Sequence, residues 1–206
     1  MLMLALFAAS GVAMLIGVIA FLSLSGGGGT PTDADARAAM LAAGCTFKSV
    51  PAKPYKGGQV HVLEGTKVKY TTFPPSGGPH YSSPAIWDFY TTPVEPRLLV
   101  HNQEHGGVIL WWGPETPEST IAKLRSFYDS SPTSMAGTPI KGLGKKVAIT
   151  AWTGDPQRYG SDAGYYGDGK AAVCPTFNEK AFKTFRDTYR GHGPEGISMN
   201  VNQPGT

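Results

Sequence analysis

Few residues of this sequence carry a charge, and basic residues are never clustered. Charged residues make up 16% of the 206 positions, the formal net charge is +3, and no three consecutive residues are Lys or Arg. Proteins that bind nucleic acids usually carry clustered basic side chains that neutralise phosphates. The composition therefore excludes nucleic acid as a partner.

Internal repeats are absent as well, which argues against a solenoid. The sequence instead holds 27 glycines and 17 prolines, and so much Gly and Pro is unusual in helical bundles and coiled coils. Short strands joined by many turns are the expected alternative. We predict an α+β domain that is rich in loops, with a small mixed or antiparallel sheet and two main flanking helices.

Charge is missing altogether from residues 1–24, which form one long apolar run. A helix of this length covers about 36 Å, enough for a hydrocarbon layer of about 30 Å. A cleaved signal peptide is the alternative, but its apolar core is normally about 7–15 residues long and follows a basic residue. We predict a transmembrane anchor that ties the protein to a membrane.

Only two cysteines are present, Cys45 and Cys174, and neither belongs to a CxxC motif. A disulfide between them is the leading interpretation, with two buried free thiols as the alternative. Such a bond persists only outside the reducing cytosol. We therefore predict a single-pass protein of the cell membrane with its globular part outside the cytoplasm, or a secreted protein if the leader is cleaved.

The chain divides into three parts by composition. Residues 1–24 are the predicted anchor, residues 25–44 a Gly-rich tether with a short helix, and residues 45–206 the globular domain. Within the last two parts the patterns predict helices at 33–43, 117–130 and 176–190, a hairpin at 59–70, strands at 98–100, 108–112 and 147–152, and an exposed loop at 153–172.

Four of the five histidines fall within 45 consecutive positions, beside strand ends or Pro/Gly turns. Imidazole is the commonest metal ligand among side chains, and it suits both copper and zinc. Ligands at the edges of loops can converge on one ion although they are distant in sequence. We predict a copper or zinc site formed by His61, His80, His101 and His105.

The residues from His101 to His105 match H-x-x-E-H, a signature of zinc hydrolases in which the glutamate is the general base. That chemistry needs a helix, because only helical spacing puts both imidazoles on one face. The strand predicted at 108–112 argues against a helix here. Glu104 is therefore expected to have one of two roles. It either orients a ligating histidine through a hydrogen bond without contacting the ion, or it caps backbone N–H groups or pairs with Arg97.

Two motifs, FPPSGGPH at 73–80 and LLVHNQEHGGVILWW at 98–112, resemble the bacterial family known as domain of unknown function 3105. Similar agreement is found at Gly44-Cys45, at His61, at ITAW in 149–152, at Cys174 and at GPE in 193–195. Members of that family are mostly short single-span or secreted proteins without an assigned activity. The resemblance implies a shared fold and a shared pair of cysteines, and it supplies no catalytic residues.

Three functions remain open from the sequence. The first is a membrane-tethered, extracytoplasmic domain with a His-lined metal site. The second is a cell-envelope interaction or scaffold protein in which the histidine side chains point apart and bind no ion. The third is a metal-dependent hydrolase, which requires an open coordination position beside Glu104.

Overall fold

The computed structural model describes residues 29–52, 60–154 and 167–206. The transmembrane helix predicted at 1–24 lies outside these residues. Among the described helices none has the length and apolar character needed to cross a membrane.

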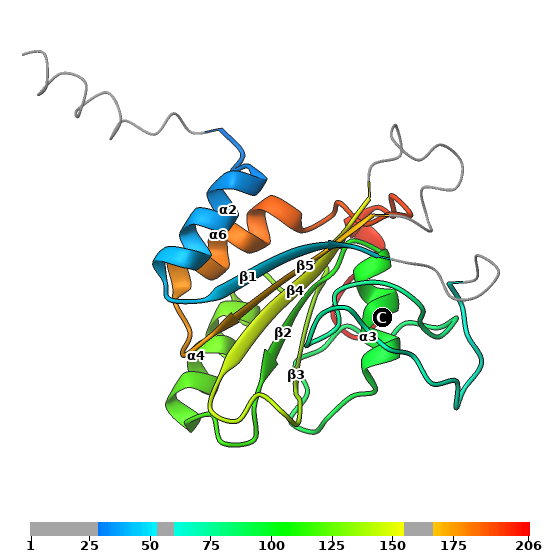
Figure 1. Cartoon of the computed structure of the whole chain (residues 1–206), viewed down its shortest axis with the longest axis horizontal. Helices are drawn as coiled ribbons and strands as arrows, with labels where there is room; N and C mark the ends of the chain where they lie inside the picture. The colour runs from blue at the N-terminus through cyan, green and yellow to red at the C-terminus, as the bar shows by residue number, and fades with distance from the viewer. Residues whose placement is uncertain (1–28, 53–59, 155–166) are drawn as a thin grey trace, which may run out of the picture. The chain divides into compact units, whose positions relative to one another are not determined.

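A five-stranded mixed sheet forms the centre of the domain (Figure 1). Its spatial order is β1-β5-β4-β2-β3, with β2 and β3 parallel and the other neighbours antiparallel. This confirms the predicted α+β class and the mixed sheet. The strands are β1 (Thr46–Pro51), β2 (Val108–Trp112), β3 (Met135–Pro139), β4 (Val147–Thr153) and β5 (Asp168–Cys174).

The sequence of β2, VILWW, explains how the sheet holds two cores. Successive side chains of a strand point to opposite faces. Val108, Leu110 and Trp112 accordingly belong to one buried cluster, whereas Ile109 and Trp111 belong to another. A strand that is buried on both faces reads as a continuous apolar run, so helices or loops must cover both sides of this sheet.

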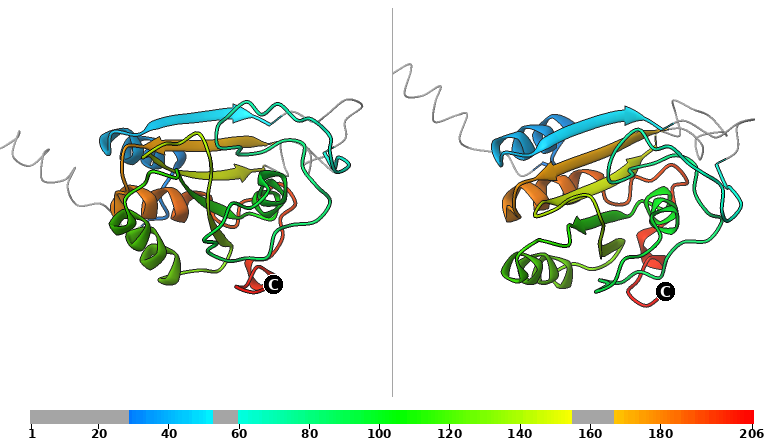
Figure 2. Two further views of the ribbon diagram at one scale, coloured as in Figure 1. Left: turned by 90° about the horizontal axis from the view of Figure 1, so that it is seen from below. Right: turned by 60° about the horizontal axis from the view of Figure 1, so that its bottom comes forward.

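Helices cover the two faces unequally (Figure 2). Three of them pack on the face that carries Val108. On the other face α3 packs together with most of residues 60–95, here called the loop segment, although Phe89 of this segment belongs to the Val108 cluster. The described part of the chain thus has four α-helices instead of two main ones. They are α2 (Asp33–Ala42), α3 (Pro96–Glu104), α4 (Glu118–Asp129) and α6 (Glu179–Tyr189), followed by the 3-10 helix η3 (Met199–Val201).

Three helices lie where the sequence predicts them. Thr32 caps α2 through a reciprocal pair of bonds with Asp35, as residues of these types do at helix N-termini. The N-cap of α6 is Asn178, whose side chain accepts the bond from Ala181 N, and it lies two residues after Thr176, the predicted cap of the helix at 176–190.

The strand predicted at 98–100 is wrong, since these residues lie in the middle of α3. Pro96 occupies the first turn, where its fixed φ favours a helix, and the side chain of Glu95 accepts a bond from Arg97 N. At the other end Gly106 has φ +85°, the left-handed conformation that commonly stops a helix. A helix therefore passes through the HxxEH motif, contrary to the prediction.

The hairpin predicted at 59–70 is not formed by residues 60–70. The only ladder contact of these residues is an isolated parallel bridge between His61 and His80. Val62 N donates to His80 O and His80 N donates to Val60 O, both at 2.8 Å. The segment thus pairs with a distant turn of the chain instead of with itself, which brings two histidines together.

A disulfide joins Cys45 to Cys174, as predicted, and the alternative of free thiols is wrong. Cys45 immediately precedes β1 and Cys174 ends β5, and these strands are antiparallel neighbours in which Thr46 pairs with Val173. The bond therefore continues an existing strand register. The loop predicted at 153–172 is wrong for Thr153, which ends β4, and for residues 168–172, which belong to β5.

Candidate metal centre

Three separate parts of the fold supply the candidate ligands. The loop segment provides His61 and His80, which its bridge holds side by side. The last turn of α3 provides His101 and Glu104, three residues apart and so on one face of the helix. His105 is the C-cap residue of the same helix.

Four of these residues form a group that could hold one metal ion. His61, His80, His101 and Glu104 each offer one ligand atom, and these atoms all lie within 4.8 Å of one another. Ligands with bonds of about 2 Å to a single ion lie about 3–4 Å apart, so small side-chain rotations would complete the coordination. The His61 and His101 rings are stacked, with centroids 5.4 Å apart, and the His80 ring is perpendicular to both.

Backbone carbonyls fix the protonation of two of these rings. His80 Nδ1 lies 2.8 Å from Gly78 O, and His101 Nδ1 lies 2.8 Å from Tyr81 O. A carbonyl oxygen only accepts hydrogen bonds, so each Nδ1 carries the proton and donates it. The neutral ring then has its lone pair on Nε2. Metal-ligating histidines are oriented in this way, by a bond from the other ring nitrogen.

Glu104 lies against one of these lone pairs. Its Oε2 is 2.9 Å from His80 Nε2 and 3.7 Å from His61 Nε2, and its side chain is 1% exposed. A carboxylate oxygen and an unprotonated imidazole nitrogen both accept hydrogen bonds, so this short distance requires a positive charge between them. That charge is either a further proton or a metal ion. Within the described residues, the ion-pair partners of Glu104 are these two histidines.

His101 is held in the neutral form that binds metals. Burial lowers its pKa to about 4, and the neighbouring His80 and His105 act in the same direction, although the bond to Tyr81 O opposes them. A neutral imidazole needs no deprotonation before it ligates a cation. At pH 7 this ring is therefore ready to coordinate.

The second and third residues of the HNQEH motif, Asn102 and Gln103, position the loop segment on α3. The Asn102 side chain accepts from Ala85 N and donates to Ala85 O. Gln103 Nε2 donates to Pro75 O at 3.2 Å. Both side chains are fully buried. The helix thus carries the ligands and also fixes the loops that place His80 against them.

Glycines after the helix allow close backbone contacts. A Cβ on Gly107 would lie 2.6 Å from Asn102 O and equally close to the Trp87 ring. A Cβ on Gly193 would lie 2.2 Å from Glu104 O. The C-terminal segment therefore packs directly on the backbone of the ligand-bearing turn.

His105 lies next to the four-residue group, outside it. Its Nε2 is 3.1 Å from His101 Nε2 and 3.0 Å from Glu195 Oε2. Three of the four histidines predicted as ligands are thus in one group, and the fourth pairs with a carboxylate. Glu195 is a site residue that the sequence patterns do not predict, although it lies in the GPE motif at 193–195.

Glu104 is placed differently from its predicted supporting role. Its carboxylate faces into the histidine group and offers a ligand atom of its own. Arg97, suggested as its partner, instead pairs with Glu95 at 2.7 Å. Distance along the helix decides this: positions 97, 101 and 104 share one face, but Arg97 lies about two turns, or about 10 Å, before Glu104.

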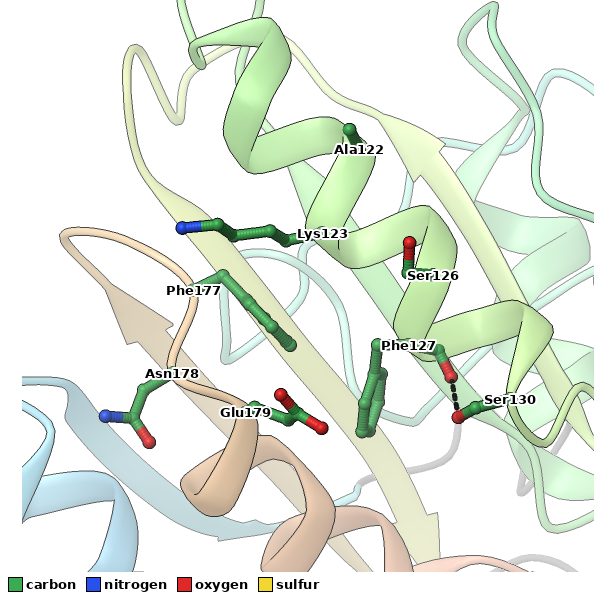
Figure 3. Close-up of a pocket in the computed structure, with 8 residues that line it drawn as sticks. All are labelled: Ala122, Lys123, Ser126, Phe127, Ser130, Phe177, Asn178 and Glu179. Atoms are coloured by element: carbon green, nitrogen blue, oxygen red, sulfur yellow. Dashed lines mark hydrogen bonds between the residues drawn. The ribbon is translucent and has the colours of Figure 1, made fainter.

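A separate hollow of about 550 Å³ lies between α4 and the start of α6 (Figure 3). The Phe127 and Phe177 rings line it with centroids 5.6 Å apart, and no histidine takes part. Its walls belong to the helices on the sheet face opposite α3. The hollow is therefore not part of the candidate metal centre.

A family model described as "Protein of unknown function (DUF3105)" matches residues 61–200. No curated protein and no solved structure is detectably similar to the chain. The matched region begins at His61 and includes every other candidate ligand as well as Glu195.

Proposed function

This chain belongs to the DUF3105 family, and we propose that its domain binds a divalent transition metal ion, zinc or copper, outside the cytoplasm while tethered to a membrane. The proposed ligands are His61, His80, His101 and Glu104.

The contact of His80 with Glu104 carries this proposal. Both partners are buried, at 0% and 1% exposure, and the 2.9 Å contact between Glu104 Oε2 and His80 Nε2 requires a positive charge, which a bound metal ion would supply. An uncompensated carboxylate in the interior is costly, whereas one that coordinates a cation is not. A metal ion satisfies this oxygen and the histidine nitrogens at once.

The donor atoms favour a divalent ion. Three imidazole nitrogens and one carboxylate oxygen suit Zn²⁺ or Cu²⁺, and Cu(I) prefers thiolates and thioethers. The two cysteines are joined in a disulfide and lie elsewhere. The group itself contains no sulfur.

The exposure of the ligands favours uptake, storage or delivery of the ion. His80, His101 and Glu104 are at most 6% exposed, whereas the His61 side chain is 46% exposed. An ion held there would be enclosed on most sides, with His61 as its most exposed ligand. The predicted anchor would keep the domain close to a membrane, where metal ions are imported and exported.

The alternatives fit this geometry less well. A scaffold protein without a metal predicts histidine rings that point apart, whereas three of them converge. A hydrolase of the HxxEH type needs Glu104 free to activate water at an open site. The helix it requires is present, but the carboxylate is buried and in contact with His80.

Metal analysis tests the proposal. The full chain, purified in detergent, is loaded with Zn²⁺ or Cu²⁺, dialysed and measured for bound metal. We expect one ion per wild-type chain and at least a tenfold loss of affinity in His61→Ala, whose exposed side chain is removable without a core cavity. His192→Ala changes the fifth histidine, an exposed residue outside the group, and is the matched control. Well below one ion in the wild type, or equal binding by the His61 variant, contradicts the proposal.

A further inference from the structure

A second set of possible ligands adjoins the four-residue group. His105 Nε2 lies 3.1 Å from His101 Nε2 on one side and 3.0 Å from Glu195 Oε2 on the other. The two additional side chains are 21% and 34% exposed, more than the buried ligands behind them. His101 thus separates an inner set of ligands from an outer, partly solvated one.

The spacing of the outer set suits metal coordination. Two nitrogens bound tetrahedrally to one zinc ion at about 2.0–2.1 Å are separated by about 3.3 Å. The observed nitrogen-to-nitrogen distance between His101 and His105 is close to this value. Glu195 adds a carboxylate, and its exposure leaves it room to rotate onto an ion.

His101 cannot serve both sets at the same time. Its Nδ1 is committed to Tyr81 O, so it has one free nitrogen, and that nitrogen binds one ion. Full coordination in the inner set and in the outer set therefore exclude each other. The two sets describe two positions for a single ion.

We propose that His101, His105 and Glu195 form an outer exchange position, through which a divalent ion passes on its way to or from the inner ligands. The proposal rests on the metal-binding function proposed above. On entry the ion binds His105 and Glu195 first, then His101, and then moves to Glu104 and the remaining histidines. His105 Nε2 lies against two acceptors, His101 Nε2 and the Glu195 carboxylate, so it carries a proton before the ion arrives. For His105 to ligate, this proton leaves to water while Nδ1 takes up a proton from water, so the ring stays neutral.

The C-terminal segment holds the outer position on the end of α3. Gly191 N donates to Gly106 O at 2.8 Å, and the Asn202 side chain donates to His105 O at 3.0 Å. Glu195 lies between these two attachment points in sequence. Its carboxylate is therefore carried by backbone that is fixed to the same helical turn as His105.

Exchange kinetics test the outer position. The full chain is loaded with one equivalent of Zn²⁺, and transfer of zinc to a chromogenic chelator is followed by stopped-flow absorbance. We expect His105→Ala to keep one zinc ion per chain but to release it at least tenfold more slowly than the wild type. Glu195→Gln, which preserves the shape of the side chain, should slow release at least threefold, and His192→Ala should leave the rate unchanged.

Two results overturn this inference while the metal-binding function survives. Release rates within twofold of wild type in both variants would show that zinc leaves by another route. Loss of stoichiometric zinc from His105→Ala would show that His105 is a permanent ligand of the bound ion. A wild-type chain that binds no zinc contradicts the proposed function itself, so the two failures are distinguishable.

Discussion

At the scale of single residues, Glu104 distinguishes a metal site from a buried ion pair. As a metal ligand its charge is useful mainly when the ion is bound, and without the ion the 2.9 Å contact with His80 Nε2 has to take up a further proton. In a structural ion pair the charge stabilises the fold at all times. The two interpretations therefore predict opposite effects of removing the charge.

We expect Glu104→Gln to abolish the stabilisation that added Zn²⁺ gives the wild type. In the presence of a chelator, the variant should be as stable as the wild type or about 1 kcal/mol more stable, because its amide can donate to His80 Nε2 without any cation. Urea unfolding with and without zinc measures both effects. A loss of about 3–5 kcal/mol in chelator would identify a structural ion pair and contradict the metal site.

At the scale of elements, α2 is attached to the sheet by a polar network as well as by apolar packing. Lys170 of β5 is 7% exposed, and its Nζ donates to Asp33 Oδ1 at 2.7 Å and to Ser49 Oγ at 2.8 Å. The Tyr189 hydroxyl of α6 donates to the same carboxylate oxygen. Asp33, in the first turn of α2, thus bonds to two other elements, β5 and α6, and Lys170 extends the network to Ser49 of β1.

Asp33→Asn should destabilise the protein by about 1 kcal/mol at pH 7, a modest value because the Asp33 side chain is 54% exposed. Burial raises the pKa of Asp33, but the bonds from Lys170 and Tyr189 outweigh it and lower this pKa below its ordinary value. The contribution is therefore present above about pH 4 and is lost as the pH falls further.

Urea unfolding at pH 7 and at pH 3 tests this pH dependence. The difference between Asp33→Asn and the wild type should shrink at the lower pH. Asp129→Asn in α4 removes an exposed i,i+4 pair with Arg125 and should cost less than about 0.5 kcal/mol. An effect of Asp33→Asn that is equally large at both pH values would show that its charge is not responsible.

Apolar periodicity in the sequence predicts three of the four described helices and misses the fourth, α3. The helices α2, α4 and α6 each have one apolar face, because solvent lies on their other side, and their periodicity predicts them. In α3 both the sheet and the loop segment surround the chain, so Leu99, Val100, Asn102 and Gln103 are all buried. Such a helix has no polar face to give it a period, and only Pro96 and Gly106 mark its ends.

The candidate site is also predictable only in part from the sequence. Clustering and loop context are enough to bring His61, His80 and His101 together in the prediction. The direct contribution of Glu104 and the displacement of His105 depend on helical phase, which requires α3 to be recognised first. Strand β5 illustrates another limit, since most of its residues (Asp, Gly, Lys and Ala) are of types depleted in strands, and pairing with β1 and β4 decides their conformation.

At the scale of the whole molecule, the disulfide links the stability of the domain to its compartment. It connects residues 129 positions apart, and in the chain-entropy model closing so long a loop contributes about 4–5 kcal/mol. Total stabilities of domains are about 5–15 kcal/mol. A chain that stays in a reducing cytosol would therefore lack a large share of its stability.

We expect export by residues 1–24 to determine whether this bond forms. The full chain is produced in a bacterium, and the cells are lysed in the presence of a thiol-reactive polyethylene glycol maleimide. Cys45 and Cys174 should remain unlabelled, because both are oxidised. A variant without residues 1–24 should stay in the cytosol and be labelled at both cysteines in denaturant. It should unfold at a lower urea concentration, because its free energy of unfolding is lower by several kcal/mol.

The double variant Cys45→Ala, Cys174→Ala controls for the labelling and should be as unstable as the cytosolic form. If the cysteines of the full chain are labelled as fully as those of the shortened one, the domain is not exported, and the proposal of an extracytoplasmic metal-binding protein fails.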